Sequence, residues 1–233
     1  EISRATILKN AVLDVFRDTD LLPDGKIRLA WQTMNECTKV PVGTGSATEN
    51  WAPQLNATSI TNKNSMRVLE GDHRNNFITY MTNYMSKSPR NCGGTPTHDV
   101  SRNADQYMRA ALNANGPWAT VPGQKNPAYL GCRRNYHILL TDGGWNGTER
   151  TTSPRNYDGS ELTFPDSVPY NNTAQTKLYW DGDTQTTIAD WAMKSWAEQL
   201  QNPDALQGKV SLSAEYQNAP LTETFVRKAG TYR

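Results

Sequence analysis

The sequence has almost no net charge and no long apolar run. Its 233 residues include 24 Lys and Arg against 23 Asp and Glu, so no overall field draws the chain toward nucleic acid or anionic lipid. No stretch approaches the roughly 20 consecutive apolar residues that a membrane-spanning helix requires. We therefore expect no membrane-spanning segment, and nothing indicates nucleic acid binding.

Apolar residues are scarce as well. The hydrophobic fraction is 36% and the mean hydropathy is −0.74, which are low values for a compact enzyme. Trp and Tyr, at 7 and 10 residues, outnumber Phe at 4. A chain of this length can bury one good core and carry insertions. We expect a single domain over residues 1–233, with long polar loops around a modest core.

Cysteine is rare too. The three cysteines, Cys37, Cys92 and Cys132, form no CxxC pair and have no histidine at metal-ligand spacing, which argues against a zinc site. Disulfide bonding is the better interpretation if the compartment is oxidising. The odd count leaves one thiol free or paired with a group outside this sequence.

Apolar residues recur at helical spacing in four segments. The predicted helices cover residues 3–18, about 72–85, about 97–113, and a stretch beginning near residue 188. In the first helix, Leu8, Val12 and Val15 form the predicted inner face. Before the last, Thr187 and Asp190 have the spacing of a capping box, with Asp in place of Glu.

Strand patterns are shorter and are separated by polar segments. Ile27, Leu29 and Trp31 alternate within residues 26–35 and predict a strand that follows a turn at residues 22–25. Residues 210–216 predict an edge strand. Segments that are polar, rich in Gly and Pro and without a sustained period are interpreted as insertions, at about 38–66, 115–132 and 145–185.

The apolar run at residues 136–141 ends at Asp142, Gly143 and Gly144. Such a run predicts a buried parallel strand. Ligands of open α/β sheets bind beyond the carboxyl ends of the strands, where Asp142 would offer a hard oxygen ligand in a tight glycine turn. Taken alone, Asp142 is more often a turn residue that bonds its own backbone.

A second loop adds to this pattern. Gly93, Gly94 and Thr95 lie between two predicted helices. A threonine hydroxyl on a glycine-rich loop can join a carboxylate in holding Mg²⁺ or another divalent ion. The alternative for Thr95 is an ordinary helix cap.

These residues carry a resemblance to known families. Residues 93–97 (GGTPT), followed by a helix and then by a strand ending in LLTDG, resemble two metal-binding segments of von Willebrand factor A domains. Residues 132–146 (CRRNYHILLTDGGWN) resemble a signature of PilY/PilC-type pilus tip adhesins, and residues 188–196 (IADWAMKSW) are similar to another segment of that family. The joint match is far more specific than any single segment.

The resemblance implies both a fold and a site. The fold would be α/β, a von Willebrand factor A-like (Rossmann-like) three-layer domain with a mostly parallel central sheet and long polar insertions. Thr95 and Asp142 would be ligands, directly or through water, of a metal-ion-dependent adhesion site holding Mg²⁺, Mn²⁺ or Ca²⁺. A disulfide between Cys92 and Cys132 would brace the two metal-bearing segments, which is a hypothesis.

The sequence departs from the family pattern at its start. The family site also uses an Asp-x-Ser-x-Ser segment ahead of the first helix, whereas this sequence opens with Glu1, Ile2 and Ser3. Ser3 lacks the companion aspartate and serine. Either the segment precedes Glu1 in the natural protein or the site is degenerate. We expect a fragment that lacks the first and last strands and contains half of a metal site.

Other candidates are weaker. His73, His98 and His137 are far apart in sequence and have no serine or cysteine beside them in a nucleophile-elbow pattern. Asp181 and Asp183 have the opening spacing of a calcium loop, but the loop lacks the glycine and the glutamate expected at its sixth and twelfth positions. Hydrolytic catalysis and a calcium loop are therefore poorly supported.

The family resemblance implies a non-catalytic cell-surface adhesion and surface-sensing module of a type IV pilus tip protein. Its roles would include pilus biogenesis, control of extension and retraction, and twitching motility. Expected partners are minor pilins at the tip and a host or abiotic surface receptor, in the extracellular space of a Gram-negative bacterium. The alternative is a structural pilus-capping subunit with a vestigial metal site. A metal-assisted hydrolase has least support, because no general base is visible beside Asp142.

Overall fold

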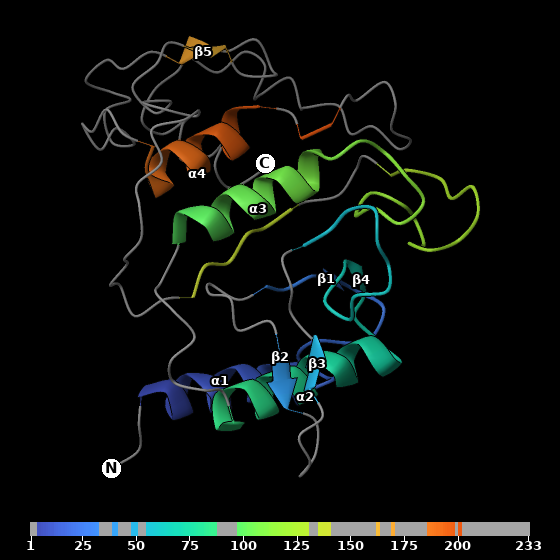
Figure 1. The fold of residues 1–233 in the computed structure, drawn as a ribbon, viewed down its shortest axis with the longest axis vertical. Coiled ribbons are helices and arrows are strands. Elements are labelled where there is room, and N and C mark those ends of the chain that lie inside the picture. The colour runs from blue at the N-terminus through green and yellow to red at the C-terminus, as the bar shows by residue number, and fades with distance from the viewer. Residues whose placement is uncertain are drawn as a thin grey trace. The chain divides into compact units, whose positions relative to one another are not determined.

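The structure is a computed structural model of the 233-residue chain, drawn in Figure 1. It describes residues 4–32, 39–41, 48–50, 55–87, 97–130, 135–140, 162–163, 169–170, 186–198 and 200–201. The elements are, in order, α1 (Arg4–Arg17), β1 (Arg28–Leu29), β2 (Lys39–Pro41), β3 (Thr48–Asn50), β4 (Arg67–Val68), α2 (Gly71–Lys87), α3 (Thr97–Arg109), β5 (Leu162–Thr163), β6 (Pro169–Tyr170) and α4 (Ile188–Ala197).

The chain divides into two compact units. The first comprises Glu1–Thr95 together with Ala110–Pro127, and the second comprises Pro96–Arg109 together with Ala128–Arg233. Among the described residues, no helix is both long and apolar enough to cross a membrane.

In the first unit, α1 confirms the helix predicted over residues 3–18. The side chain of Asp18 ends this helix, because its Oδ1 accepts the backbone N–H groups of Asp20 and Leu21, both at 2.9 Å. The buried face agrees with the prediction only in part, since Val12 packs against the core. Leu13 is buried, whereas the predicted inner residues Leu8 and Val15 are exposed, because α1 turns a neighbouring stripe toward its partner helix.

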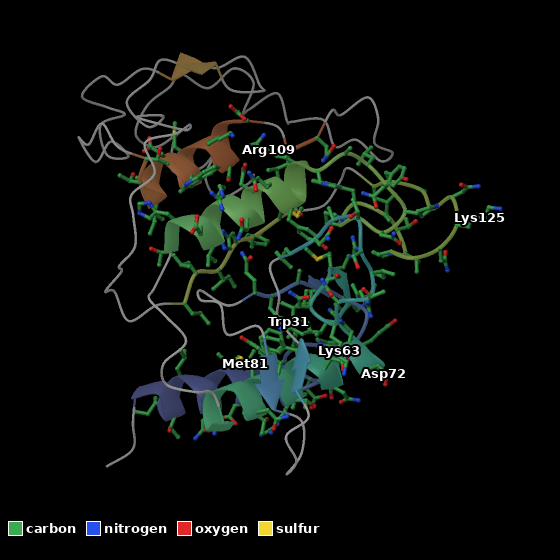
Figure 2. The ribbon with its side chains drawn as sticks, in the orientation of Figure 1. Trp31, Lys63, Asp72, Met81, Arg109 and Lys125 are labelled. Atoms are coloured by element: carbon green, nitrogen blue, oxygen red, sulfur yellow. The ribbon has the colours of Figure 1, made fainter. Side chains whose placement is uncertain are left out.

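That partner is α2, which lies beside α1 (Figure 1). Trp31, labelled in Figure 2, forms a buried core cluster of the first unit with Phe77 and Tyr80. The ring centroids of Phe16 and Phe77 lie 4.4 Å apart, and those of Trp31 and Phe77 lie 5.2 Å apart, within the range of favourable aromatic pairs. Val12, Phe16, Leu29 and Met81 pack against this cluster.

The turn predicted at residues 22–25 is confirmed. Gly25 has a positive φ of 78°, a conformation that glycine adopts without steric cost. Its backbone N–H donates to the carbonyl oxygen of Leu69 at 3.3 Å. The turn therefore directs the chain from α1 into β1.

In the described part of the strand predicted over residues 26–35, which ends at residue 32, the strand is β1. It pairs antiparallel with β4 in the register Arg28 to Val68 and Leu29 to Arg67. Beyond β1, Trp31 is held by loop residue Asn64, whose Nδ2 donates to the Trp31 carbonyl oxygen at 2.7 Å. The predicted insertion at 38–66 contains a further antiparallel pair, β2 with β3.

Among the described residues every paired strand is antiparallel, in three two-stranded sheets that also include β5 with β6. The mostly parallel three-layer fold, and its extent over one domain, remain predictions.

The segment predicted as an insertion at 115–132 is partly core in its described portion. Trp118 and Ala119 are buried, and the Asn115 side chain donates to the carbonyl oxygen of Thr58 at 2.9 Å. The Arg28 guanidinium donates to the carbonyl oxygen of Pro117 at 2.6 Å. The composition of this segment is polar, but the burial of Trp118 and Ala119 holds its described part against the rest of the first unit.

The second unit contains α3 and α4, which pack against each other (Figure 1). Both helices were predicted, although α3 ends at Arg109 rather than near residue 113. The predicted capping box of α4 is confirmed: Thr187 N–H donates to Asp190 Oδ2 at 2.8 Å, and Asp190 N–H donates to Thr187 Oγ1 at 3.3 Å. This box satisfies two backbone donors that a helix start leaves open.

Candidate functional site

The predicted ligands Thr95 and Asp142 lie outside the described residues, as do Cys37, Cys92 and Cys132. The structure therefore leaves their predicted roles as predictions. It does describe the segments next to them in sequence. Helix α3 begins two residues after Thr95, and the described residues 135–140 end two residues before Asp142.

The start of α3 is polar and shielded from water. Thr97 and His98 are both buried, and Thr97 is only 2% exposed. Ser101 Oγ donates to the Thr97 carbonyl oxygen at 2.9 Å, yet Thr97 Oγ1 has no hydrogen-bond partner among the described residues. A buried hydroxyl without a partner costs about 1–3 kcal/mol. This hydroxyl is thus an oxygen available to a ligand, water or ion, and sequence reasoning did not single it out.

Residues 135–140 differ from the prediction. They form no strand, and Tyr136, Ile138 and Leu140 are 72%, 78% and 50% exposed. The buried parallel strand predicted over 136–141 is therefore wrong for its described part. An apolar run of this kind is buried only where neighbouring strands pair with it and both faces are covered, and no described strand pairs with it.

A buried polar network joins α3 to α4. The Asp105 carboxylate, with a side chain only 2% exposed, accepts from Arg109 Nε at 2.8 Å and from Ser195 Oγ at 2.9 Å. Lys194 Nζ lies 3.9 Å from its other oxygen. A buried carboxylate is tolerated when cations and hydrogen-bond donors surround it. The α4 segment that carries the family-like residues is thereby fixed to α3.

Arg109, labelled in Figure 2, extends this network beyond Asp105. Its Nη1 lies 3.0 Å from Glu198 Oε2, and its Nη2 donates to the Lys194 carbonyl oxygen at 3.2 Å. The ion pair between Asp105 and Arg109 could have been predicted from their spacing of four residues on a helix. No local spacing predicts the contacts that α4 makes with them.

The described residues contain no group of three or more His, Cys, Asp or Glu side chains arranged to hold a metal ion. The donors that the resemblance implies are the Thr95 hydroxyl and the Asp142 carboxylate, to which the orphaned Thr97 hydroxyl adds a third oxygen close in sequence. Hydroxyl and carboxylate oxygens are the ligands preferred by Mg²⁺, Mn²⁺ and Ca²⁺. The donor chemistry fits a hard divalent cation.

Comparison with known proteins decides the family. The chain is 34% identical over 170 residues to the type IV pilus biogenesis factor PilY1 of Pseudomonas aeruginosa PAO1, a match covering 73% of the chain and 13% of that relative. The chain belongs to the PilY1-type family of type IV pilus factors. The PilY1 proteins of strains PAK and UCBPP-PA14 are each 32% identical to it, over 73% and 77% of the chain and 12% of each relative.

The family assignment confirms the predicted resemblance to PilY/PilC-type pilus proteins. The chain spans only 12–13% of the length of these PilY1 relatives. No family model matches the chain, and no solved structure does.

Proposed function

We propose that this chain is the part of a PilY1-type pilus factor that presents a divalent-metal adhesion site at the pilus tip. The observation that carries the proposal is the similarity to PilY1 over 73% of the chain, joined to the Thr95 and Asp142 motifs. The relatives are named as pilus biogenesis factors, which supports a role in building or operating the type IV pilus.

The start of α3 adds one oxygen donor close in sequence to Thr95. Thr97 has a hydroxyl without a hydrogen-bond partner among the described residues. Because the N-terminal end of a helix itself disfavours a cation, the metal would depend on a carboxylate ligand. Thr95 lies two residues ahead in the same loop, and Asp142 would supply the charged ligand. A bound divalent cation would offer an open coordination position to a carboxylate on a partner. No catalytic step is part of this proposal.

The α3 to α4 network would keep the loop in place under load. Asp105, Arg109 and Ser195 join the helix that follows Thr95 to the segment at 188–196. Pulling on an adhesive tip would stress such a contact, so we propose that the same unit takes part in surface sensing, twitching motility and the balance of pilus extension and retraction. The proposed partners are minor pilins and a host or abiotic surface, outside the cell.

The rival function is that of a structural subunit which caps the pilus and whose metal site is vestigial. One observation favours it: the charge of Asp105 is balanced by protein side chains, and the network needs no metal ion. Under that hypothesis, Asp105 would matter for piliation and Asp142 would not.

The test compares variants of the full-length protein in the parent bacterium. Asp142→Ala and Thr95→Ala should reduce surface adhesion and twitching at unchanged protein level. The control is Asp158→Ala, which removes an acidic residue from the polar segment at 145–185 and should reduce neither. Adhesion and twitching that are equal in all three strains would overturn the metal-adhesion proposal. Loss of piliation with Asp105→Ala alone would favour the structural subunit.

A further inference from the structure

A buried histidine at the start of α2 is in an environment that favours its neutral form. His73, the third residue of α2, is 5% exposed. Its Nε2 lies 2.9 Å from the Leu29 carbonyl oxygen. Because a carbonyl only accepts, Nε2 carries the proton. Nδ1 is buried and has no hydrogen-bond partner in the part of the chain that the structure describes. The ring thus joins α2 to β1 through one hydrogen bond, while its other nitrogen, Nδ1, is buried and carries no proton.

The charges around His73 are mostly positive. Arg28 on β1 and Arg67 on β4 both act on it electrostatically as cations. On α2 itself, Asp72 is exposed, as is Glu70 just before the helix. The next residue, Arg74, is taken up by an ion pair with Asp24 at 2.7 Å.

Two further features bear on a charged ring. The first turn of a helix disfavours a cation, because the helix dipole is positive there. The Trp31 ring, with its centroid 5.2 Å from that of His73, would favour a cation modestly. From α1, the side chains packed into this core are the apolar Val12 and Phe16. No contact among these supplies an acceptor for a second ring proton.

We propose that His73 is an acid-sensitive latch: protonation at Nδ1 places a proton without an acceptor beside two guanidinium groups, so that β1 separates from α2 and Trp31 becomes accessible. The change requires only a proton from solvent. The opened region would be the β1 segment and the loop at Asn64 that holds Trp31. This device is independent of the metal proposal, because it uses none of the predicted ligands.

The direction of the pH effect follows from the same surroundings. Burial lowers the pKa of His73 below its ordinary value of 6.5; the hydrogen bond to Leu29 raises it, and Arg67 and Arg28 lower it further. The unfolded chain therefore binds the proton more readily than the folded one. The contribution of neutral His73 to stability is therefore complete at about pH 7.5. It is lost as pH falls through the pKa of His73 in the unfolded chain toward its lower pKa in the folded chain.

The test follows hydrogen exchange of the Trp31 amide, which donates to the Asn64 carbonyl oxygen at 3.2 Å, in the full 233-residue chain. After correction for the intrinsic pH dependence of exchange, protection should fall about tenfold or more between pH 7.5 and 5, because the opened form takes up a proton at the ordinary histidine pKa of 6.5 while burial keeps the pKa of the closed form lower. His73→Gln, whose amide can donate to Leu29 without titrating, should show no such fall. His98→Gln is the matched control and should behave like the unsubstituted chain.

NMR of the His73 imidazole in the unsubstituted chain tests the proposal even if His73→Gln does not fold. The proposal requires the Nε2–H tautomer at pH 7.5 and a His73 titration midpoint below 6.5. A midpoint at or above 6.5, or equal loss of Trp31 protection in a folded His73→Gln chain, would overturn it.

Discussion

Asp105 on α3 accepts a hydrogen bond from Ser195 on α4 at 2.9 Å, across 90 positions of sequence. The same carboxylate oxygen accepts from Arg109 at 2.8 Å. One buried group therefore joins the helix that follows the predicted metal loop to the helix that carries a family-like segment. It is the main polar link between these two helices among the described residues.

Asp105→Ala should destabilise the second unit by about 1–3 kcal/mol, because Arg109 and Ser195 both lose a buried acceptor while Arg109 keeps its ion pair with Glu198. Urea unfolding, with hydrogen exchange along α3 and α4, measures this loss. Asp99→Ala on the same helix is the control. Asp99 pairs with Arg102 at 3.1 Å where both side chains are partly exposed, so its loss should cost about 0–1 kcal/mol. Equal costs would contradict the role of the network.

Arg74 connects three parts of the first unit. Its guanidinium donates to the carbonyl oxygens of Phe16 at 2.7 Å and Leu22 at 2.6 Å, and its Nε donates to Asp24 at 2.7 Å. Arg74→Ala should cost about 3–5 kcal/mol, because the buried side chain supports two carbonyls as well as an ion pair. Arg74→Lys should recover only part of this, since an ammonium group lacks the fork geometry.

Asp24→Asn separates the contributions of Arg74. The Asp24 side chain is 52% exposed, so removing its charge should cost only about 0–1 kcal/mol. Thermal unfolding of the three variants gives the comparison. If Asp24→Asn proves as damaging as Arg74→Ala, the carbonyl contacts contribute little and the prediction fails.

Thr187→Ala should shorten or fray α4, at a cost of about 0.5–2 kcal/mol, because it removes the oxygen that accepts from the Asp190 N–H. Thr187→Ser retains the hydroxyl and should stay close to the unsubstituted chain. Hydrogen exchange at the first turn of α4 reports the difference. Identical exchange in the Ala and Ser variants would show that the cap is unimportant.

The predicted disulfide has a direct chemical test. If Cys92 and Cys132 pair, a non-reducing peptide map of protein from the oxidising compartment should contain them in one linked peptide. Recovery of both Cys92 and Cys132 in alkylated form would rule the pairing out.

Local signals in the sequence predicted the helices well. Helical spacing located α1, α2 and α3, and the Thr187 to Asp190 spacing located the start of α4, because capping and amphipathic periodicity are properties of neighbouring residues. The inner face of α1 was predicted only in part: Val12 packs against the core, but Leu8 and Val15 are exposed and Leu13 is buried, because tertiary packing decides how far the buried face extends around the helix.

Features that depend on distant partners were not predictable in this way. The contact of Ser195 with Asp105, the burial of Trp118 in a polar segment and the exposure of Ile138 all depend on which part of the chain lies opposite. Short apolar runs are ambiguous for the same reason. The metal motifs were recognised from residue types alone, and Thr97 was missed because only its burial reveals an unpaired hydroxyl.

The central claim is that Asp142 binds a divalent cation at an adhesion site. Calorimetric titration of Mg²⁺, Mn²⁺ and Ca²⁺ into the full-length pilus factor, compared with its Asp142→Ala variant, tests it most directly. The account predicts one fewer bound cation in Asp142→Ala and a weaker site in Thr95→Ala, with Asp158→Ala unchanged. Identical stoichiometry and affinity in the Asp142→Ala and unsubstituted proteins, for all three cations, would contradict it.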